Sequence, residues 1–322
     1  MITRRAALAG AVVLASSGVR AQAFPARPPR FVIPFPAGGI VDVVGRAVGE
    51  KLAGLLGQQV IADNRTGANG AIATDIVAKA PADGYTWLLA TVSHVVTPHL
   101  QKVDYDPVGD FAGAAYLCNV PAIAVVPAAS PFKSMTDVIA KAKAEPGKLT
   151  YLSPGIGTSM HLNMEMVRVR TGAAVAGVPY RGLPPGMPDL LEGRLDFALL
   201  PPVLAGAHIR AGKLRPLAVA ASQRLKSVPD VPTFAEAGLA DSVVESWYVT
   251  LVPAKTPKDI VARIHAATVE ALKDEAVQQK LEAAGAVLPP APLSPADVDA
   301  LLKRELPRYG ELVKAAGIKA ES

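Results

Sequence analysis

The sequence predicts an α/β fold in which helices cover the faces of mostly parallel sheets, and three observations support this prediction. Short runs of β-branched and aromatic residues alternate with segments of helical periodicity along the chain. Glycine-rich turns join strands to the helices that follow them. The segment from Phe24 to Ser322 is long enough for two domains with a sizeable core.

The first expected strand–turn–helix unit lies near the start of the chain. Phe31–Ile33 reads as a short buried strand, and two prolines end it because proline donates no amide hydrogen bond. Gly38 and Gly39 permit unusual backbone angles and the close approach of a ligand. From Val41 the apolar residues recur at helical spacing. The amides at this helix N-terminus favour an anion, although a plain strand-to-helix turn explains the glycines equally well.

The first half of the chain continues the alternation. We expect strands at 59–62 and 85–90, a helix at 71–80 and a polar, glycine-rich loop at 63–70. The strand at 85–90 opens into Thr91, Ser93 and His94. Ligands of parallel sheets bind at the carboxyl ends of the strands, where the turn at 37–39 and these three residues both fall.

The remaining elements predict a second domain and a return to the first. The expected strands are 117–126, 149–152, 195–200, 214–220 and 247–252, and the expected helices are 134–144, one from about Leu162 to Thr171, 188–192, 259–273, 276–284 and 295–316. Val125–Pro127 is the first expected crossing, and Trp247–Val252 is the strand that returns. The C-terminal helices, the last kinked at Pro307, are expected to clasp the first domain and the hinge.

A second strand–turn–helix unit repeats the pattern of the first. After the strand at 149–152 come Ser153, Gly155 and Gly157, and then Thr158 and Ser159 beside the amides of a new helix. These hydroxyls either cap the helix only or also face a ligand. The pairing of two such turns, placed to face each other across a cleft, favours a ligand. The order Gly-Ile-Gly-Thr-Ser differs from Gly-x-Ser-x-Gly and does not support a serine hydrolase.

Tyr180 and Arg181 follow at another expected strand end. A guanidinium can hold a carboxylate through two parallel hydrogen bonds. Arg181 is either such a group or an ordinary surface cation, and the sequence leaves both interpretations open.

Residues 1–23 read as an export signal. Arg4 and Arg5 precede the apolar run Ala6–Ser17, and Ala21–Ala23 is an Ala-x-Ala cleavage site. The apolar run is shorter than the roughly 20 residues that a membrane span needs. We expect cleavage after Ala23 and a periplasmic mature chain, exported by the general or the twin-arginine route.

The charge and the cysteine content exclude several classes of function. Removing the three arginines of the leader lowers the formal net charge from +5 to +2, and no basic cluster with interleaved aromatics remains, which argues against nucleic acid. Cys118 is the only cysteine, and an apolar-flanked single thiol is most often a buried small residue. The five histidines show no metal-ligand spacing. We expect no catalytic residue, no metal and no cofactor.

Many short blocks along the mature chain follow the order found in one receptor family. They are Pro34–Gly39 with Asp42, Asp63–Gly67, Ala80–Tyr85, Asp104–Pro107 with Asp110-Phe111, Pro146–Leu149, Gly157–Ser159 with His161-Leu162, Val178–Gly182, Asp189–Gly193, Ala211–Arg215, Val231–Thr233 with Glu236–Gly238, and Ala316–Lys319. One block alone is weak, whereas so many in the same order are specific. On these blocks the sequence resembles the TctC-like solute-binding proteins of tripartite tricarboxylate transporters, the Bug family.

The resemblance implies a type II periplasmic binding protein fold, with two α/β domains and a ligand cleft between them. The implied domains are residues 24–125 with 248–322, and residues 126–247. It also implies a receptor without catalysis, and we expect this receptor to be a monomer. Such a receptor passes a small mono- or dicarboxylate to the large and small membrane subunits of a transporter; aromatic acids and amino acids are further ligand classes.

The ligand contacts implied by the resemblance come from both domains. The first domain contributes Phe35, Ala37, Gly38, Gly39 and Asp42, with Thr91, Ser93 and His94 at the neighbouring strand end, and the second contributes Ser153, Gly157, Thr158, Ser159, Tyr180 and Arg181. Four positions depart from the family pattern and leave the identity of the ligand open: Gly45, Pro154, Ile156 and Thr158.

Two alternatives to a transport receptor stay open. A receptor that reports to a sensor kinase would have the same sequence features. An exported hydrolase would use Ser93, Ser159 or Asp42, but it would need a base paired with a nucleophile, and the spacing of these residues does not require such a pair.

Overall fold

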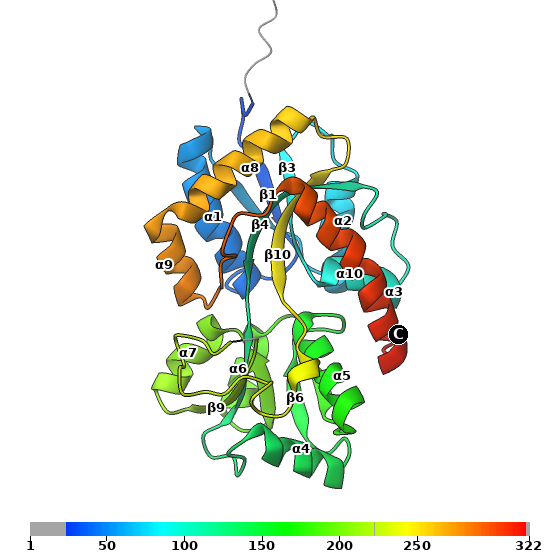
Figure 1. The fold of residues 1–322 in the computed structure, drawn as a ribbon, viewed down its shortest axis with the longest axis vertical. Coiled ribbons are helices and arrows are strands. Elements are labelled where there is room, and N and C mark those ends of the chain that lie inside the picture. The colour runs from blue at the N-terminus through cyan, green and yellow to red at the C-terminus, as the bar shows by residue number, and fades with distance from the viewer. Residues whose placement is uncertain (1–23, 222, 320–322) are drawn as a thin grey trace, which may run out of the picture.

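Two five-stranded sheets organise the part of the chain that the computed structural model describes, residues 24–221 and 223–319. Each sheet forms the centre of one α/β domain, and the two domains lie one above the other in Figure 1. The predicted leader, residues 1–23, lies outside the described residues. In the described part, no helix has both the length and the apolar character that a membrane crossing requires.

The first sheet has the strand order β2-β1-β3-β10-β4. Its strands are β1 (Arg30–Ile33), β2 (Ile61–Asn64), β3 (Thr86–Thr91), β4 (Phe111–Asn119) and β10 (Trp247–Pro253). β1 pairs in parallel with β2 and β3, whereas β10 is antiparallel to both β3 and β4. The mostly parallel sheet that the sequence predicts therefore forms, with the returning strand β10 as its antiparallel member.

Helices cover both faces of the first sheet, because both faces of its strands are apolar. They are α1 (Ile40–Leu56), α2 (Ala71–Ala78), α3 (Ser93–Leu100), α8 (Lys258–Lys273), α9 (Glu275–Ala283) and α10 (Pro295–Ala316), with a 3₁₀ turn, η1, at Ala68–Gly70. One buried cluster joins the sheet to α1, α8 and α9, and another joins it to α2, α3 and α10.

The second sheet repeats the arrangement, with the order β7-β6-β8-β5-β9. Its strands are β5 (Ala122–Pro127), β6 (Thr150–Ser153), β7 (Ala176–Pro179), β8 (Phe197–Leu200) and β9 (Leu214–Ala220). Here β5, the strand that enters from the first domain, is the antiparallel member. The elements around it are α4 (Met135–Ala144), α5 (Ser159–Thr171), α6 (Met187–Leu191), α7 (Pro202–Arg210) and the 3₁₀ turns η2 (Pro184–Gly186) and η3 (Ala240–Ser242).

The chain crosses between the domains along two adjacent segments. It leaves the first sheet at Asn119 and enters the second at Ala122, ahead of the crossing expected at Val125–Pro127. On its return, the carbonyl of Ser246 accepts the amide of Val120 at 2.9 Å. The single strand expected at 117–126 is thus two strands in different sheets. We propose the same two domains as the sequence predicted, except that the first boundary lies between Asn119 and Ala122 and not after residue 125.

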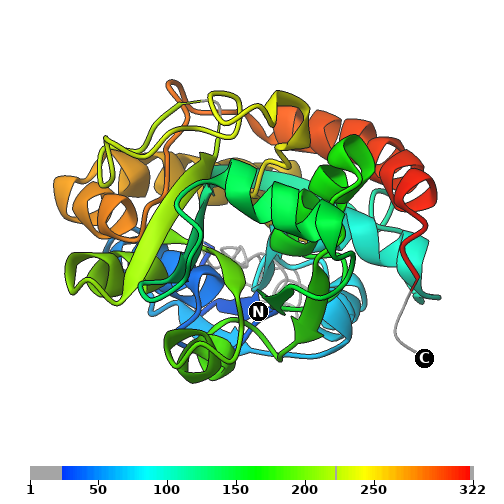
Figure 2. The same cartoon turned by 90° about the horizontal axis from the view of Figure 1, so that it is seen from below.

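Other differences from the expected elements are local. The residues after β3 form α3, so Ser93 and His94 begin a helix. The helix α7 was not predicted, because two prolines and several small residues obscure its periodicity. The helix α10 continues through Pro307 and ends beside α5, where Arg168 donates to the carbonyl of Ala316 (Figures 1 and 2). The last helix therefore contacts both domains on one side, whereas the sequence predicted contact with the first domain and the hinge.

Candidate functional site

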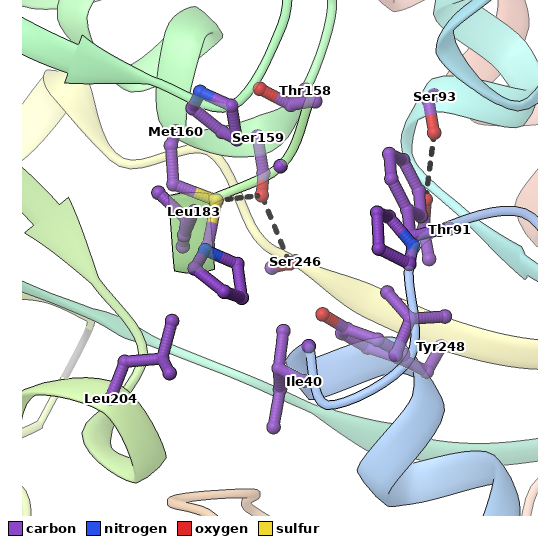
Figure 3. A pocket seen from close by; sticks show the side chains of 17 residues that line it. Ile40, Thr91, Ser93, Thr158, Ser159, Met160, Leu183, Leu204, Ser246 and Tyr248 are labelled. Atoms are coloured by element: carbon purple, nitrogen blue, oxygen red, sulfur yellow. Dashed lines mark hydrogen bonds between the residues drawn. The ribbon is translucent and has the colours of Figure 1, made fainter. Parts of the chain in front are cut away.

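The N-termini of α1 and α5 meet at one cavity between the two domains. Gly39 is the N-cap of α1 and Thr158 is the N-cap of α5, and both residues line this cavity. The free amides and the positive dipole end of a helix both favour an anion. The two strand–turn–helix units that the sequence predicted thus converge on the same space, shown in Figure 3.

The first turn is tied to a carboxylate of its own helix. Gly38 has φ +78°, a left-handed conformation that favours glycine, and its amide donates to Asp42 Oδ2 at 3.0 Å. Asp42 is buried and also accepts Arg46 Nε at 2.9 Å and Asn64 Nδ2 at 3.0 Å. Burial alone would raise the pKa of Asp42, but these hydrogen bonds together lower it below its usual value. Asp42 is therefore an ionised brace of the turn, and its carboxylate is fully engaged there.

The second turn is tied by a neutral hydroxyl. Thr158 Oγ1 donates to the carbonyl of Gly155 at 2.8 Å and accepts the amide of His161 at 3.4 Å. Gly157 has φ +82°, and a Cβ there would lie 2.6 Å from Leu100 Cδ1 of the first domain. This glycine therefore lets the second turn pack directly against α3.

The returning segment before β10 supplies a third wall of the cavity. Ser159 Oγ donates to Ser246 Oγ at 3.0 Å, and Tyr248 lines the same space (Figure 3). The buried side chain of Asn163 on α5 accepts the amide of Val244 at 2.9 Å and donates to its carbonyl at 3.3 Å. The N-terminus of α5 is thus fixed to the segment through which the chain returns to the first domain.

Hydroxyl groups and apolar groups line this cavity, and its lining includes no charged side chain. The hydroxyls are those of Thr91, Ser93, Thr158, Ser159, Ser246 and Tyr248, and the apolar lining includes Phe35, Ile40, Val41, Met160, Leu183 and Leu204. Thr91 and Ser93 hydrogen-bond each other at 2.8 Å. The open space is about 60 Å³. Such a lining offers hydrogen bonds to an anion without a counter-ion.

A second cavity, of about 530 Å³, adjoins the first. Both are bordered by Phe35, Pro36, Pro154 and Gly182, so these residues stand at the junction. Tyr180 and Arg181 line the second cavity and not the first. The hydroxyl of Tyr180 donates to Asp189.

Six of the predicted ligand contacts line the first cavity, two line only the second cavity, and six line neither. The first group is Phe35, Gly39, Thr91, Ser93, Thr158 and Ser159; the second is Tyr180 and Arg181; the last is Ala37, Gly38, Asp42, His94, Ser153 and Gly157. Ala37 and Gly38 face solvent, and Ser153 Oγ accepts the amide of Gly155 at 3.4 Å. Apart from His94, these residues belong to the two turns or brace them.

His94 lies inside the first domain. Its ring packs on Tyr105 and Phe111, and Nε2 lies 2.8 Å from the carbonyl of Pro107. A carbonyl only accepts, so Nε2 carries the proton. Burial lowers the pKa of His94 to about 4. In the described residues, no group of three or more His, Cys, Asp or Glu side chains is placed to hold a metal ion.

Sequence reasoning missed the apolar walls and the returning segment. Ser246 and Tyr248, Leu183, and Leu204 come from three places away from the two turns along the chain. A short apolar or hydroxyl residue has no motif of its own. The one available signal is that Ser246 and Tyr248 flank the predicted return to the first domain.

Two α/β domains, joined by adjacent crossing segments and enclosing a cavity at two helix N-termini, define a two-domain solute-binding protein. Residues 44–318 match the family model described as tripartite tricarboxylate transporter family receptor, TctC. The chain belongs to this family, as its sequence blocks indicated.

Relatives and solved structures agree with this assignment. BugT of Bordetella pertussis is 35% identical over 327 residues, which is 99% of each chain. The adipate complex of Rpa4515 from R. palustris has a TM-score of 0.86 at 33% identity and covers 92% of this chain and 100% of its own. MatC of Rhodopseudomonas palustris with bound malate has a TM-score of 0.83 at 31% identity, over 90% and 100%. The type II binding-protein fold expected from the resemblance is confirmed.

Proposed function

We propose that this chain is a periplasmic, monomeric receptor that captures a small carboxylate between its domains and delivers it to the large and small membrane subunits of a tripartite tricarboxylate-type transporter. The observation that supports this most is that Gly39 and Thr158, the N-caps of two helices, line one cavity. The adipate and malate bound to two relatives support the ligand class.

In the proposed complex, one carboxylate of the ligand replaces water at the two helix N-termini. The amides near Gly39 and Thr158 and the hydroxyls of Ser93, Ser159 and Ser246 are the proposed donors. Anions at helix N-termini are stabilised without a cation, because the amides and the dipole act together. Burial of the ligand then accompanies closure of the two domains.

The lining argues against a hydrolase. Ser159 donates to Ser246, and Thr91 hydrogen-bonds Ser93, so the hydrogen-bond partners of these hydroxyls are other hydroxyls. No histidine or carboxylate belongs to the residues that line the cavity. A serine nucleophile needs such a base within hydrogen-bond reach. The same lining is well suited to binding alone.

The test is native mass spectrometry and calorimetry with adipate and malate, on the wild type and on Gly39→Val. A Cβ at residue 39 would lie 3.2 Å from the carbonyl oxygen of Pro36, and the φ of −77° permits any residue. The variant should therefore fold, while the added side chain fills part of the cavity. We expect affinity to fall by about 10- to 100-fold.

Gly54→Val is the matched control, because a Cβ at Gly54 on the same helix meets no atom within 4 Å. It should bind like the wild type. A wild type that binds neither acid and releases no carboxylate would overturn the proposal, as would full affinity in Gly39→Val.

A further inference from the structure

The second cavity has the size of a ligand site, and the first does not. Binding pockets for small molecules measure about 300–1,000 Å³. The second cavity, of about 530 Å³, falls in this range, whereas the first, of about 60 Å³, is well below it. Because the two share Phe35, Pro36, Pro154 and Gly182 as walls, a ligand held at the helix N-termini has room to extend into the second cavity.

One charged side chain lines this second cavity. Arg181 is that residue, and it carries no carboxylate partner: the described residues 24–221 and 223–319 offer it neither an ion pair nor a hydrogen bond. The nearest acidic group by sequence, Asp189, is occupied by the hydroxyl of Tyr180 and by Arg194 Nε at 2.8 Å. The cavity therefore presents an uncompensated positive charge, next to a cavity that has none.

Another part of the lining of the second cavity is a strained turn. Ala68 and Asn69 have φ of +47° and +51°, left-handed values that are rare for residues other than glycine. Asn69 Nδ2 donates to Thr97 Oγ1 at 3.1 Å, and Gln101 Nε2 donates to the carbonyl of Ala68 at 3.3 Å. Strained backbone of this kind concentrates at ligand sites, where the surrounding contacts hold it in place. This part of the lining is thus prearranged and polar.

We propose that the second cavity binds the distal carboxylate of an elongated dicarboxylate, with Arg181 as its counter-ion. The other carboxylate lies at the N-termini of α1 and α5, so this inference rests on the function proposed above. The methylene chain between them passes the junction, where the side chains are Phe35, Pro36 and Pro154. Apolar contact suits a hydrocarbon chain there. The receptor accordingly selects diacids over monoacids of equal length.

The experiment compares adipate with hexanoate, which has the same six carbons and one carboxylate, by calorimetry at constant ionic strength. We expect the wild type to bind adipate more tightly. Arg181→Gln should lose about 10- to 100-fold in adipate affinity, the range of a hydrogen-bonded charge, and should bind hexanoate within about twofold of the wild type. Arg181→Lys should recover part of the loss, because it keeps the charge without the planar fork.

Arg170→Gln is the control, because Arg170 is an exposed cation of the same domain that lines neither cavity. It removes the same net charge and should leave both affinities unchanged. If Arg181→Gln leaves the ratio of adipate affinity to hexanoate affinity unchanged, the inference is wrong. The proposed carboxylate receptor would be unaffected by that result. A wild type that binds neither acid would instead overturn the receptor proposal itself.

Discussion

The two helix N-termini at the cavity are stabilised by different chemistry. α1 begins at Gly39, which has no side chain to cap it, and the buried carboxylate of Asp42 ties the turn from inside the helix. α5 begins at Thr158, whose hydroxyl caps the helix directly. The side of the site in the first domain is therefore built on an ionised group, and the side in the second domain on neutral ones.

This difference decides which helix offers more attraction to an anion. Asp42 places a negative charge in the first turn of α1, which offsets the positive dipole end, and Arg46 offsets Asp42 in turn. The first turn of α5 contains no acidic residue. The positive end of α5 is thus uncompensated. We infer that the first turn gives the site its fixed shape, while the second contributes more of the attraction.

The largest expected effect tests whether the first domain is the acid-sensitive one. The pKa of buried His94 is lowered to about 4, below its ordinary value of about 6.5. A lowered folded-state pKa means that stability is full above pH 6.5 and falls as the unfolded chain takes up the proton. His94 should therefore cost about 3 kcal/mol between pH 6.5 and 4. Urea unfolding at several pH values measures this loss.

The variant His94→Gln isolates the effect. It keeps an N–H donor for the carbonyl of Pro107 but cannot be protonated, so its stability should fall much less over the same pH range. His208→Gln, a change on α7 of the second domain, is the control and should keep the pH dependence of the wild type. Equal slopes in His94→Gln and the wild type would show that acid acts elsewhere.

The next effect tests the ionised brace of the first turn. Asp42→Ala leaves the amide of Gly38 and the side chains of Arg46 and Asn64 without their acceptor. We expect a loss of about 2–3 kcal/mol in the free energy of unfolding at neutral pH. Because the pKa of Asp42 is lowered in the folded state, its contribution is present above about pH 4 and is lost below it.

Asp137→Ala provides the comparison for this brace. Asp137 forms an exposed capping box at the start of α4, so its removal should cost about 1 kcal/mol. Similar losses for the two variants, measured by urea unfolding without ligand, would mean that burial of Asp42 adds nothing to its hydrogen bonds.

The sequence was sufficient to predict both strand–turn–helix units, the mostly parallel sheets and the return of β10 to the first domain. These features depend on local patterns: an apolar run, glycine at a turn, and helical spacing after it. For the same reason the sequence could place Gly39 and Thr158 at two helix starts that face each other, and both line one cavity. Each sits at a helix start that its neighbours along the chain define.

The direction of buried polar side chains could not be predicted in this way. The short segment after β3 gives no local sign that α3 begins at Ser93, and this early start places His94 among Tyr105 and Phe111. Asp42 belongs to the right turn, but only its contacts with Arg46 and Asn64 show that its carboxylate braces the turn. Ser246 reaches the cavity through the order of strands in the sheet, which is a long-range property.

The smallest effect tests the neutral cap of the second turn. Thr158→Ala removes the acceptor for the amide of His161 and the donor to the carbonyl of Gly155. An N-cap of this kind contributes about 1 kcal/mol, so the variant should lose less stability than Asp42→Ala, with no change in its acid sensitivity. Thr158→Ser keeps the hydroxyl and should restore the wild-type stability.

The adipate affinity of Thr158→Ala should also fall, because Thr158 lines the cavity. Thr136 is exposed on α4, and loss of its hydroxyl should change neither the stability nor the adipate affinity. A stability loss equal to that of Asp42→Ala would mean that the two turns are equivalent, and the uneven attraction inferred for the two helices would lose its structural basis.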